Sequence, residues 1–275
     1  MNYDFALKDG MAVLFLDILG FSNLVVHYKD FCFDDGKPHG LTLKYENVYK
    51  QIIERYETLT KDGKSSFIWF SDTIILTTGI ENANSLVKEL TYLQNSFLSC
   101  GVALRGCICT GKLYCGNNNM WGESIIRANH IEKDIADYPR VIIPQGDYEK
   151  LPLQPYSKYF STLNINDSGY MEFSFFDMKL DELLKSKPEF HDVTVSTLLT
   201  YIKEIEQNYF TASLKVKYKW EWLASRLLAA IKFRKDILCS LTKDYELEKV
   251  SYDSLIKRLE CIAHPILTNK QISYT

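Results

Sequence analysis

A continuously apolar run near the N-terminus, AVLFLDILGFSNLVV, is the feature that most constrains the fold of this 275-residue chain. Its first part, Met11–Leu19, predicts a strand that is buried on both faces, because odd and even positions alike are apolar. The run contains a single acid, Asp17, and a buried carboxylate without a partner costs several kcal/mol. The strand is therefore expected at the centre of a core, where Asp17 needs something to neutralise it.

The composition is that of an ordinary globular protein, with 46% hydrophobic residues, 24% charged residues and a formal net charge of -3. Without an excess of basic charge, neither nucleic acid nor an acidic membrane surface is indicated as a partner. The N-terminal segment lacks the features of a secretory signal, and the apolar run is too short and interrupted to span a bilayer. The seven cysteines show no zinc-ligand or disulfide spacing, which predicts reduced thiols in the cytoplasm.

Strand-like and helix-like segments alternate through the first part of the chain. The elements expected after the first strand are a helix at 42–59, a hairpin at 65–79, a helix at 83–101, a second hairpin at 102–119, a helix at 121–138, a short strand at 140–144 and a late hairpin at 158–176. The order β-α-β-β-α-β predicts a ferredoxin-like α+β fold, in which helices cover one face of an antiparallel sheet.

The last part of the chain has a different pattern. After about Asp192 the apolar positions recur at helical spacing, and four of the seven prolines fall between Tyr138 and Tyr156. We therefore divide the chain into a sheet domain over residues 1–180 and a C-terminal helical extension over residues 181–275. The extension is expected to pack on the sheet domain or to serve in dimerisation.

Two acids are predicted to meet in this fold. The first strand and the following hairpin are neighbours in a ferredoxin-like sheet, so Asp17 near the end of one lies beside Asp72 at the turn of the other. Two carboxylates beside a glycine-containing turn favour Mg²⁺ or Mn²⁺. The turn Leu19-Gly20-Phe21 offers backbone N–H groups to a phosphate. In the alternative interpretation, Asp17 binds local backbone amides and Asp72 is a turn former.

Four motifs, VLFLDILGFSNLV, FSDTIIL, LRGCICTGKLYCG and WGESIIRANHIEKD, follow one another as in the catalytic domain of class III nucleotidyl cyclases. The chain resembles this family over about Met11–Pro144, and looks closest to the Pycsar pyrimidine cyclases of bacterial anti-phage defence. The resemblance implies that residues 1–180 are a catalytic domain with the class III cyclase fold. It further implies a phosphorus–oxygen lyase in which Asp17, Asp72 and the carbonyl of Ile18 hold two Mg²⁺ or Mn²⁺ ions. The product would be a 3′,5′-cyclic nucleotide, with pyrophosphate as the leaving group.

The positions that select the base depart from those of the purine cyclases. Their lysine four residues before the hairpin aspartate is Ile68 here, and a second base-selecting position, two before the WG pair, is Asn119. Strand alternation places Ile68, Phe70 and Asp72 on one face, which makes the floor of the base pocket apolar. A pocket without polar partners for a purine favours UTP or CTP, and hence cUMP or cCMP, between which the sequence does not choose. In the alternative, Ile68 and Phe70 are core residues.

The phosphate-binding positions depart as well. Where purine cyclases have an asparagine and an arginine on the WG helix, this chain has Ile126 and His130. In one interpretation, Arg127 or Lys133 takes the place of the phosphate-binding arginine. In the other, Arg105 of the LRG triplet contributes the positive charge, because an arginine in an apolar strand needs a carboxylate or a substrate as partner. His130 either contacts phosphate or lies at the surface. The candidate nucleotide-binding residues are Leu19, Gly20, Phe21, Ile68, Phe70, Arg105, Asn119, Arg127 and His130.

The resemblance also implies an assembly and a cellular role. Class III sites form between two subunits, so we expect a homodimer in which one subunit supplies the metal-binding acids and the other the LRG triplet and the WG helix. A cytoplasmic second-messenger synthase of this kind activates a separate effector. Three alternatives stay open. One is a catalytically inactive pseudo-cyclase that binds nucleotides and uses its helices for interaction, and another is a purine nucleotide cyclase. The third, an enzyme on a polymerase-like palm, is disfavoured because a GGDEF-like string and a basic groove are absent.

Overall fold

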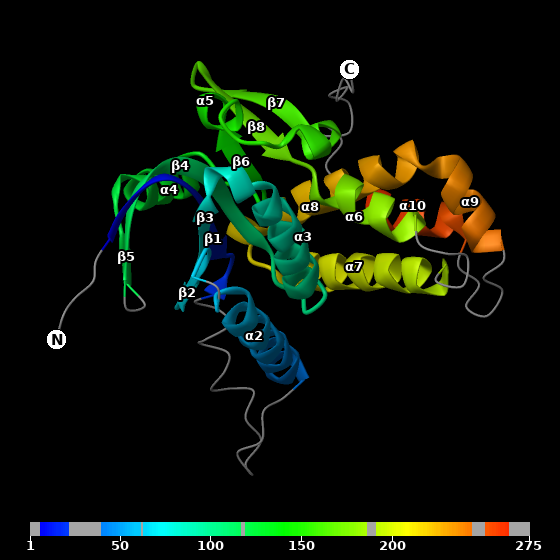
Figure 1. Ribbon diagram of the computed structural model, residues 1–275. Coiled ribbons are helices and arrows are strands. Elements are labelled where there is room, and N and C mark those ends of the chain that lie inside the picture. The colour runs from blue at the N-terminus through cyan, green and yellow to red at the C-terminus, as the bar shows by residue number, and fades with distance from the viewer. Residues whose placement is uncertain are drawn as a thin grey trace, which may run out of the picture. The chain divides into compact units, whose positions relative to one another are not determined.

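The computed structural model describes residues 6–21, 40–61, 63–116, 119–185, 191–243 and 251–263. The chain divides into two compact units, Met1–Phe173 and Ser174–Thr275. The first unit holds all the described strands and the second is made of helices (Figure 1). The division follows directly after the last of those strands.

The first unit is built on one eight-stranded sheet in the order β2-β3-β1-β4-β6-β8-β7, with β5 paired to β4 outside this path. The strands are β1 Ala6–Ile18, β2 Ser66–Phe70, β3 Thr73–Gly79, β4 Leu104–Gly116, β5 Asn119–Trp121, β6 Val141–Pro144, β7 Phe160–Ile165 and β8 Ser168–Phe173. Each pair is antiparallel except β4 and β6, which run parallel. The predicted α+β fold is confirmed, and β1 lies beside the β2–β3 hairpin as expected.

Helices cover both faces of the sheet, so the expectation that they cover one face is wrong. On one face α4 (Glu123–Asp134) packs over Phe15 and its neighbours. On the other face α2 (Gly40–Leu59) and α3 (Asn84–Leu98) meet the ring of Trp69. The physical reason lies in β1, whose alternate positions are apolar and buried on both sides, so that each face needs a cover.

A buried acid joins the two helices on the second face. Glu89 of α3 accepts hydrogen bonds from Arg55 Nε (2.8 Å), from Arg55 Nη2 (2.7 Å) and from the hydroxyl of Tyr56 (2.9 Å). Burial and the negative charge of Glu89 raise the pKa of Tyr56, so this phenol stays protonated. The contact ties α2 to α3 and has no part in the site described below.

The second unit contains five described helices: α6 Phe175–Leu184, α7 His191–Thr211, α8 Leu214–Phe233, α9 Lys235–Lys243 and α10 Tyr252–Glu260. The helical character expected after about Asp192 is confirmed within the described residues. The helices bury an apolar core that includes Leu198, Trp222 and Leu227. No described helix combines the length and the hydropathy that a membrane crossing requires.

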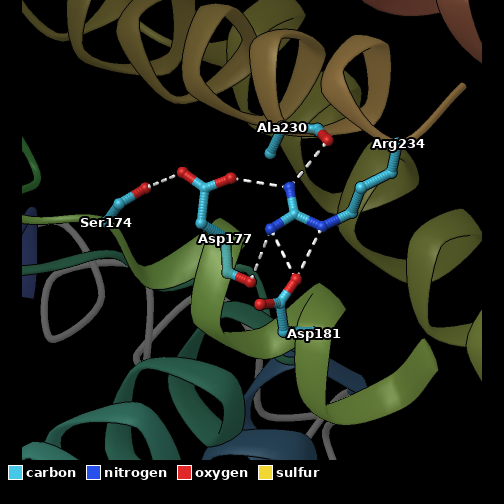
Figure 2. A network of polar contacts seen from close by, with 5 residues as sticks. All are labelled: Ser174, Asp177, Asp181, Ala230 and Arg234. Carbon is cyan, nitrogen blue, oxygen red and sulfur yellow. Dashed lines mark hydrogen bonds and ion pairs between the residues drawn. The ribbon is translucent and has the colours of Figure 1, made fainter. Parts of the chain in front are cut away.

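A buried arginine ties α6 to the end of α8 (Figure 2). Arg234 binds Asp177 Oδ1 at 2.6 Å and Asp181 Oδ1 at 2.7 Å, and it also donates to the carbonyl oxygens of Ala230 and Asp177, each at 3.0 Å. The other oxygen of Asp177 accepts from the hydroxyl of Ser174. Burial opposes the charge of Arg234, but the hydrogen bonds to the two carboxylates outweigh it and raise the pKa of the guanidinium.

Candidate active site

Asp17 and Asp72 meet at one edge of the sheet. Asp17 is the penultimate residue of β1, and the amide of the next residue, Ile18, donates to the carbonyl oxygen of Asp72 at 2.8 Å. The residues Ser71 and Asp72 form a two-residue turn between β2 and β3, with Ser71 in the left-handed region at φ 56°. The indole Nε1 of Trp69 holds this turn by donating to the carbonyl of Ser71 at 3.0 Å. The structure thus brings the two acids together, while their role as metal ligands stays a prediction.

One cross-strand row carries several candidate residues. Arg105 of β4 lies opposite Asp17 of β1, Asp17 lies opposite Thr73 of β3, and Thr73 lies opposite Phe70 of β2. Paired residues project to the same face of a sheet, so these side chains share the face that α4 covers. Phe70 is 77% exposed, so the row ends in an open aromatic ring beside the acids.

Ile68 belongs to the next row on the same face. It lies opposite Ile75, which is partly buried and packs against the apolar cluster under α4. Ile68 itself is half-buried, so it contributes to the core and also borders the site. Phe70 is too exposed to be a core residue of this chain, so the core interpretation is wrong for Phe70.

Arg105 links Asp17 to a third acid, Glu132 of α4. Arg105 Nε donates to Asp17 Oδ2 at 3.0 Å, and its Nη2 lies 2.5 Å from Glu132 Oε1. The side chains of Arg105 and Asp17 are each 18% exposed, whereas that of Glu132 is 4% exposed. Burial raises the pKa of the Glu132 carboxyl; Arg105 opposes the rise, and the charges of Asp17 and Asp72 add to it. The acid of the first strand is therefore neutralised by an arginine in this structure.

Glu132 was not predicted from the sequence as a site residue. Its position carried a signal, because Glu132 stands four residues after Ala128 and eight after Ser124, which places all three on one face of the helix. That face is the buried one. An acid on a buried helix face needs a cationic partner, and Arg105 was the unpaired arginine of the neighbouring strand.

Gly106 explains why the arginine reaches the acids. A Cβ at this position would lie 1.9 Å from the carbonyl oxygen of Phe15, so a glycine is required for β4 to approach β1 this closely. The close approach sets Arg105 against Asp17 of the same chain. Within one chain Arg105 therefore lies beside Asp17, because β1 and β4 are neighbours in one sheet. The expectation that the LRG triplet serves the acids of the other subunit stays a prediction.

The turn after β1 is only partly available to a phosphate. Gly20 has φ 77° and an exposed backbone, as a phosphate-binding turn requires. The amide of Leu19, however, donates to the carbonyl oxygen of Ala103 at 2.9 Å, so it is already bonded. The predicted phosphate cradle therefore retains Gly20 and Phe21, and the residues from 22 to 39 lie outside those that the structure describes.

Of the three candidate cations of α4, Arg127 and His130 have acidic neighbours other than Asp17 and Asp72, whereas Lys133 is exposed and lies close enough to Glu132 for their charges to interact. Arg127 Nη2 lies 2.7 Å from Oδ2 of Asp147, a buried residue of the short helix α5 (Gln145–Tyr148). Thr110 donates to the other oxygen of Asp147 at 2.8 Å. His130 has a side chain that is 71% exposed and lies 3.9 Å from the carboxylate of Asp134. Arg127 thus has a structural partner, and His130 faces solvent.

Asn119 lies at the far end of the sheet. It pairs with Gly116, which is eleven residues along β4 from Arg105. At about 3.3 Å per residue, this separation is about 35 Å of strand. Within one chain, Asn119 therefore does not reach the acids.

The acid edge is the end of the sheet where Asp17 and Asp72 meet. The oxygen atoms that it offers fit a hard divalent cation whose remaining ligands come from a substrate. Among the described residues, no group of three or more His, Cys, Asp or Glu side chains is arranged to hold a metal ion. Asp17, Asp72 and the backbone oxygens beside them supply oxygen ligands only. Mg²⁺ accepts such an incomplete set, because it keeps several water molecules and binds through one or two carboxylates together with substrate phosphates.

No family model and no curated protein matches the chain. Among solved structures, the chain is similar to the adenylyl cyclase CyaB from P. aeruginosa, with 13% identity and a TM-score of 0.40, over 62% of this chain and 95% of that one. Two structures of a bacterial light-regulated adenylyl cyclase match with 12% and 10% identity and TM-scores of 0.40. These two matches cover 62% of this chain and 52% of each of those chains, so this chain spans about half their length.

Proposed function

We propose that this chain is a nucleotide cyclase that converts UTP or CTP into the 3′,5′-cyclic monophosphate and pyrophosphate. The observation that carries the proposal is the meeting of Asp17 and Asp72 at an open sheet edge, with the exposed ring of Phe70 in the same row. In this proposal Asp17, Asp72 and the carbonyl of Ile18 hold two Mg²⁺ or Mn²⁺ ions. When bound, such ions activate the ribose 3′-OH and neutralise the charge that develops on the phosphates.

Ile68 and Phe70 support a pyrimidine base. Both side chains are apolar and share the face of Asp17. A purine presents additional polar edge atoms, and an apolar floor leaves such atoms without hydrogen-bond partners. A purine nucleotide cyclase is the alternative if Ile68 acts only as part of the core.

The position of Asn119 supports a homodimer. If Asn119 contacts the base, it does so in the site of a second copy, because about 35 Å of strand separate it from the acids of its own chain. Each copy then supplies Asp17, Asp72 and Arg105 to one site and Asn119 to the other. The family resemblance supports the rest of the proposal, a cytoplasmic second-messenger synthase of anti-phage defence whose product activates a separate effector.

The contacts of α4 favour a second candidate, a catalytically inactive pseudo-cyclase that binds nucleotides. Arg127 is paired with Asp147, and His130 faces solvent near Asp134. In one chain, neither Arg127 nor His130 is therefore paired with the acid edge, which leaves Lys133, an exposed residue whose charge interacts with Glu132, as the α4 cation for a triphosphate. The C-terminal helices would then provide an interaction surface.

The test compares the four ribonucleoside triphosphates. The purified chain is incubated with ATP, GTP, CTP or UTP and Mn²⁺, and the products are identified by mass, for the wild type, Asp17→Asn and Asp72→Asn. We expect cyclic product from CTP or UTP. Cyclase activity should fall by more than about a hundredfold in both variants, because mutation of a residue that only supports a metal ligand already lowers metal affinity or activity by about 10–100-fold. Asp134→Asn, an exposed acid of α4, is the matched control.

Each other outcome selects an alternative. Nucleotide binding without turnover supports the pseudo-cyclase. Cyclic product from ATP or GTP overturns the pyrimidine assignment and leaves the cyclase itself standing. Full activity of Asp17→Asn and Asp72→Asn overturns the proposed site.

A further inference from the structure

The guanidinium of Arg105 occupies a carboxylate that the proposed function assigns to a metal ion. Its Nε donates to Asp17 Oδ2 at 3.0 Å. A divalent cation at Asp17 and this guanidinium carry charge of the same sign, and such charges a few ångströms apart repel each other by kcal/mol amounts near a protein surface. A metal ion and Arg105 therefore compete for Asp17.

Glu132 offers Arg105 a second place to bind. Arg105 Nη2 and Glu132 Oε1 form an ion pair at 2.5 Å, without the geometry of a hydrogen bond, whereas Arg105 Nε donates a hydrogen bond to Asp17. Glu132 lies on the buried face of α4 and is 4% exposed, so its carboxylate is fixed against the sheet, whereas Asp17 is 18% exposed at the open edge. The close approach of β4 to β1 at Gly106 fixes the backbone beside Arg105. Arg105 is thus able to release Asp17 and keep an ionic partner.

We propose that Glu132 is a positioning residue that permits metal binding, because it retains Arg105 when Mg²⁺ or Mn²⁺ takes Asp17. The inference rests on the proposed function in one respect, the assignment of Asp17 as a metal ligand. In the metal-free chain Arg105 bridges Asp17 and Glu132. In the metal-bound chain Arg105 gives up its hydrogen bond to Asp17 and stays paired with Glu132.

Glu132 acts through Arg105 in this scheme, and is not a third metal ligand. The described residues contain no arrangement of three acids, histidines or cysteines that is suited to a metal ion, although Asp17, Asp72 and Glu132 lie close enough for their charges to interact. The guanidinium stands between Asp17 and Glu132. When Glu132 is removed, Asp17 is the acid that holds Arg105. A metal ion that binds Asp17 then breaks this contact, and Arg105 no longer keeps the ion pair with Glu132.

A double-mutant cycle tests the inference on the intact chain, with Mn²⁺ alone as the probe. Binding is followed by the loss of the electron paramagnetic resonance signal of free Mn²⁺ for the wild type, Glu132→Gln, Arg105→Met and the double variant. We expect Glu132→Gln to weaken Mn²⁺ binding about tenfold, which corresponds to about 1.4 kcal/mol. In the Arg105→Met background, the same change should have less than about a threefold effect, because no guanidinium remains to be retained.

The matched controls are Glu89→Gln and Arg55→Met, which make the same chemical changes in the ion pair between α2 and α3. Both should bind Mn²⁺ as the wild type does. Thermal unfolding of each variant establishes that it is folded. Should Arg105→Met fail to fold, Arg105→Gln removes the charge with a shorter polar side chain and takes its place in the cycle.

The outcomes separate this inference from the proposed function. An effect of Glu132→Gln that is equally large in both backgrounds means that Glu132 binds the metal or attracts it by charge alone, and overturns the inference. An unchanged affinity in Glu132→Gln overturns it too. Asp17→Asn is titrated with Mn²⁺ in the same way, and wild-type binding by this variant removes the metal site itself, and with it the proposed function.

Discussion

Two arginines in this chain each join a pair of acids, and their surroundings differ. Arg234 is 7% exposed, and its Nε, Nη1 and Nη2 all donate, to Asp177, to Asp181 and to two backbone carbonyls (Figure 2). Arg105 is 18% exposed and binds Asp17 and Glu132 at an edge of the sheet that also presents the open ring of Phe70. Arg234 is therefore a fixed cross-link between helices, whereas Arg105, in the proposal above, is a counterion that a metal ion replaces at Asp17.

The largest expected effect is the difference in unfolding free energy between Arg234→Met and Arg105→Met, and its absence would contradict the comparison of the two arginines. Arg234→Met leaves two carboxylates of the helical unit without their cation, and the loss of one partner from a buried ion pair costs about 3–5 kcal/mol. Arg105→Met should cost less, about 1–2 kcal/mol, because Asp17 regains contact with water and the buried Glu132 is able to take up a proton. Urea denaturation of the two variants, followed by circular dichroism, measures the difference.

Equal losses of unfolding free energy in the two variants would contradict the distinction between a cross-link and a replaceable counterion. Addition of Mn²⁺ gives the internal control. It should restore stability to Arg105→Met, where the acids are open to a cation, and should leave the deficit of Arg234→Met unchanged.

A smaller effect is expected on base selection when Ile68, near Arg105, is replaced. Ile68 borders the acid edge in the row next to that of Asp17, so a lysine at Ile68 places a polar donor at the proposed base pocket. We expect Ile68→Lys to raise the ratio of purine to pyrimidine cyclisation by about 10–100-fold, which is about 1–3 kcal/mol of discrimination. Competition between CTP or UTP and ATP or GTP, with products resolved by mass, measures this ratio.

Leu59→Lys serves as the control for that experiment, because Leu59 is an exposed apolar residue at the end of α2, which covers the other face of the sheet. It introduces the same side chain on the face opposite to that of Asp17. A ratio that is unchanged in Ile68→Lys, or changed equally in Leu59→Lys, would show that Ile68 does not border the base.

The elements with strong local patterns were predictable from the sequence. β1 is continuously apolar and therefore central, and its pairing with the β2–β3 hairpin follows from the order of the elements. The late hairpin was also predictable, and in the structure its turn consists of Asn166 and Asp167, both in the left-handed region at φ 49° and 61°. The burial of β1 on both faces requires a cover on each face, so the helices on the second face also followed from the sequence, although only one covered face was predicted.

The partners of the charged residues were not predictable, because they come from distant segments. Arg127 is paired with Asp147, twenty residues later, and this pairing is seen only once the chain is folded. Asp17 meets Arg105 across 88 residues because Gly106 lets two strands approach. Local spacing indicated that Arg105 needed a partner, and the register of the sheet decided which acids it found.

The smallest expected effect concerns the pH dependence of the acid edge. Burial raises the pKa of Glu132; Arg105 opposes this rise, and Asp17 and Asp72 add to it. A carboxyl whose pKa is higher in the folded than in the unfolded chain binds its proton more tightly when folded, so protonation stabilises the fold. This contribution is complete below the ordinary carboxyl pKa of about 4.3, and it is lost as the pH rises through the raised pKa.

Glu132→Gln cannot ionise at this position, so the comparison with the wild type isolates the contribution. The unfolding free energy of the wild type minus that of the variant should increase as the pH falls from 7 toward 4.3. Urea denaturation at several pH values measures it, and the other titrating groups are common to both proteins. A difference that stays constant, or decreases toward low pH, would mean that Arg105 neutralises Glu132 completely. Arg105 would then be as firmly held as Arg234, and less able to yield Asp17 to another cation.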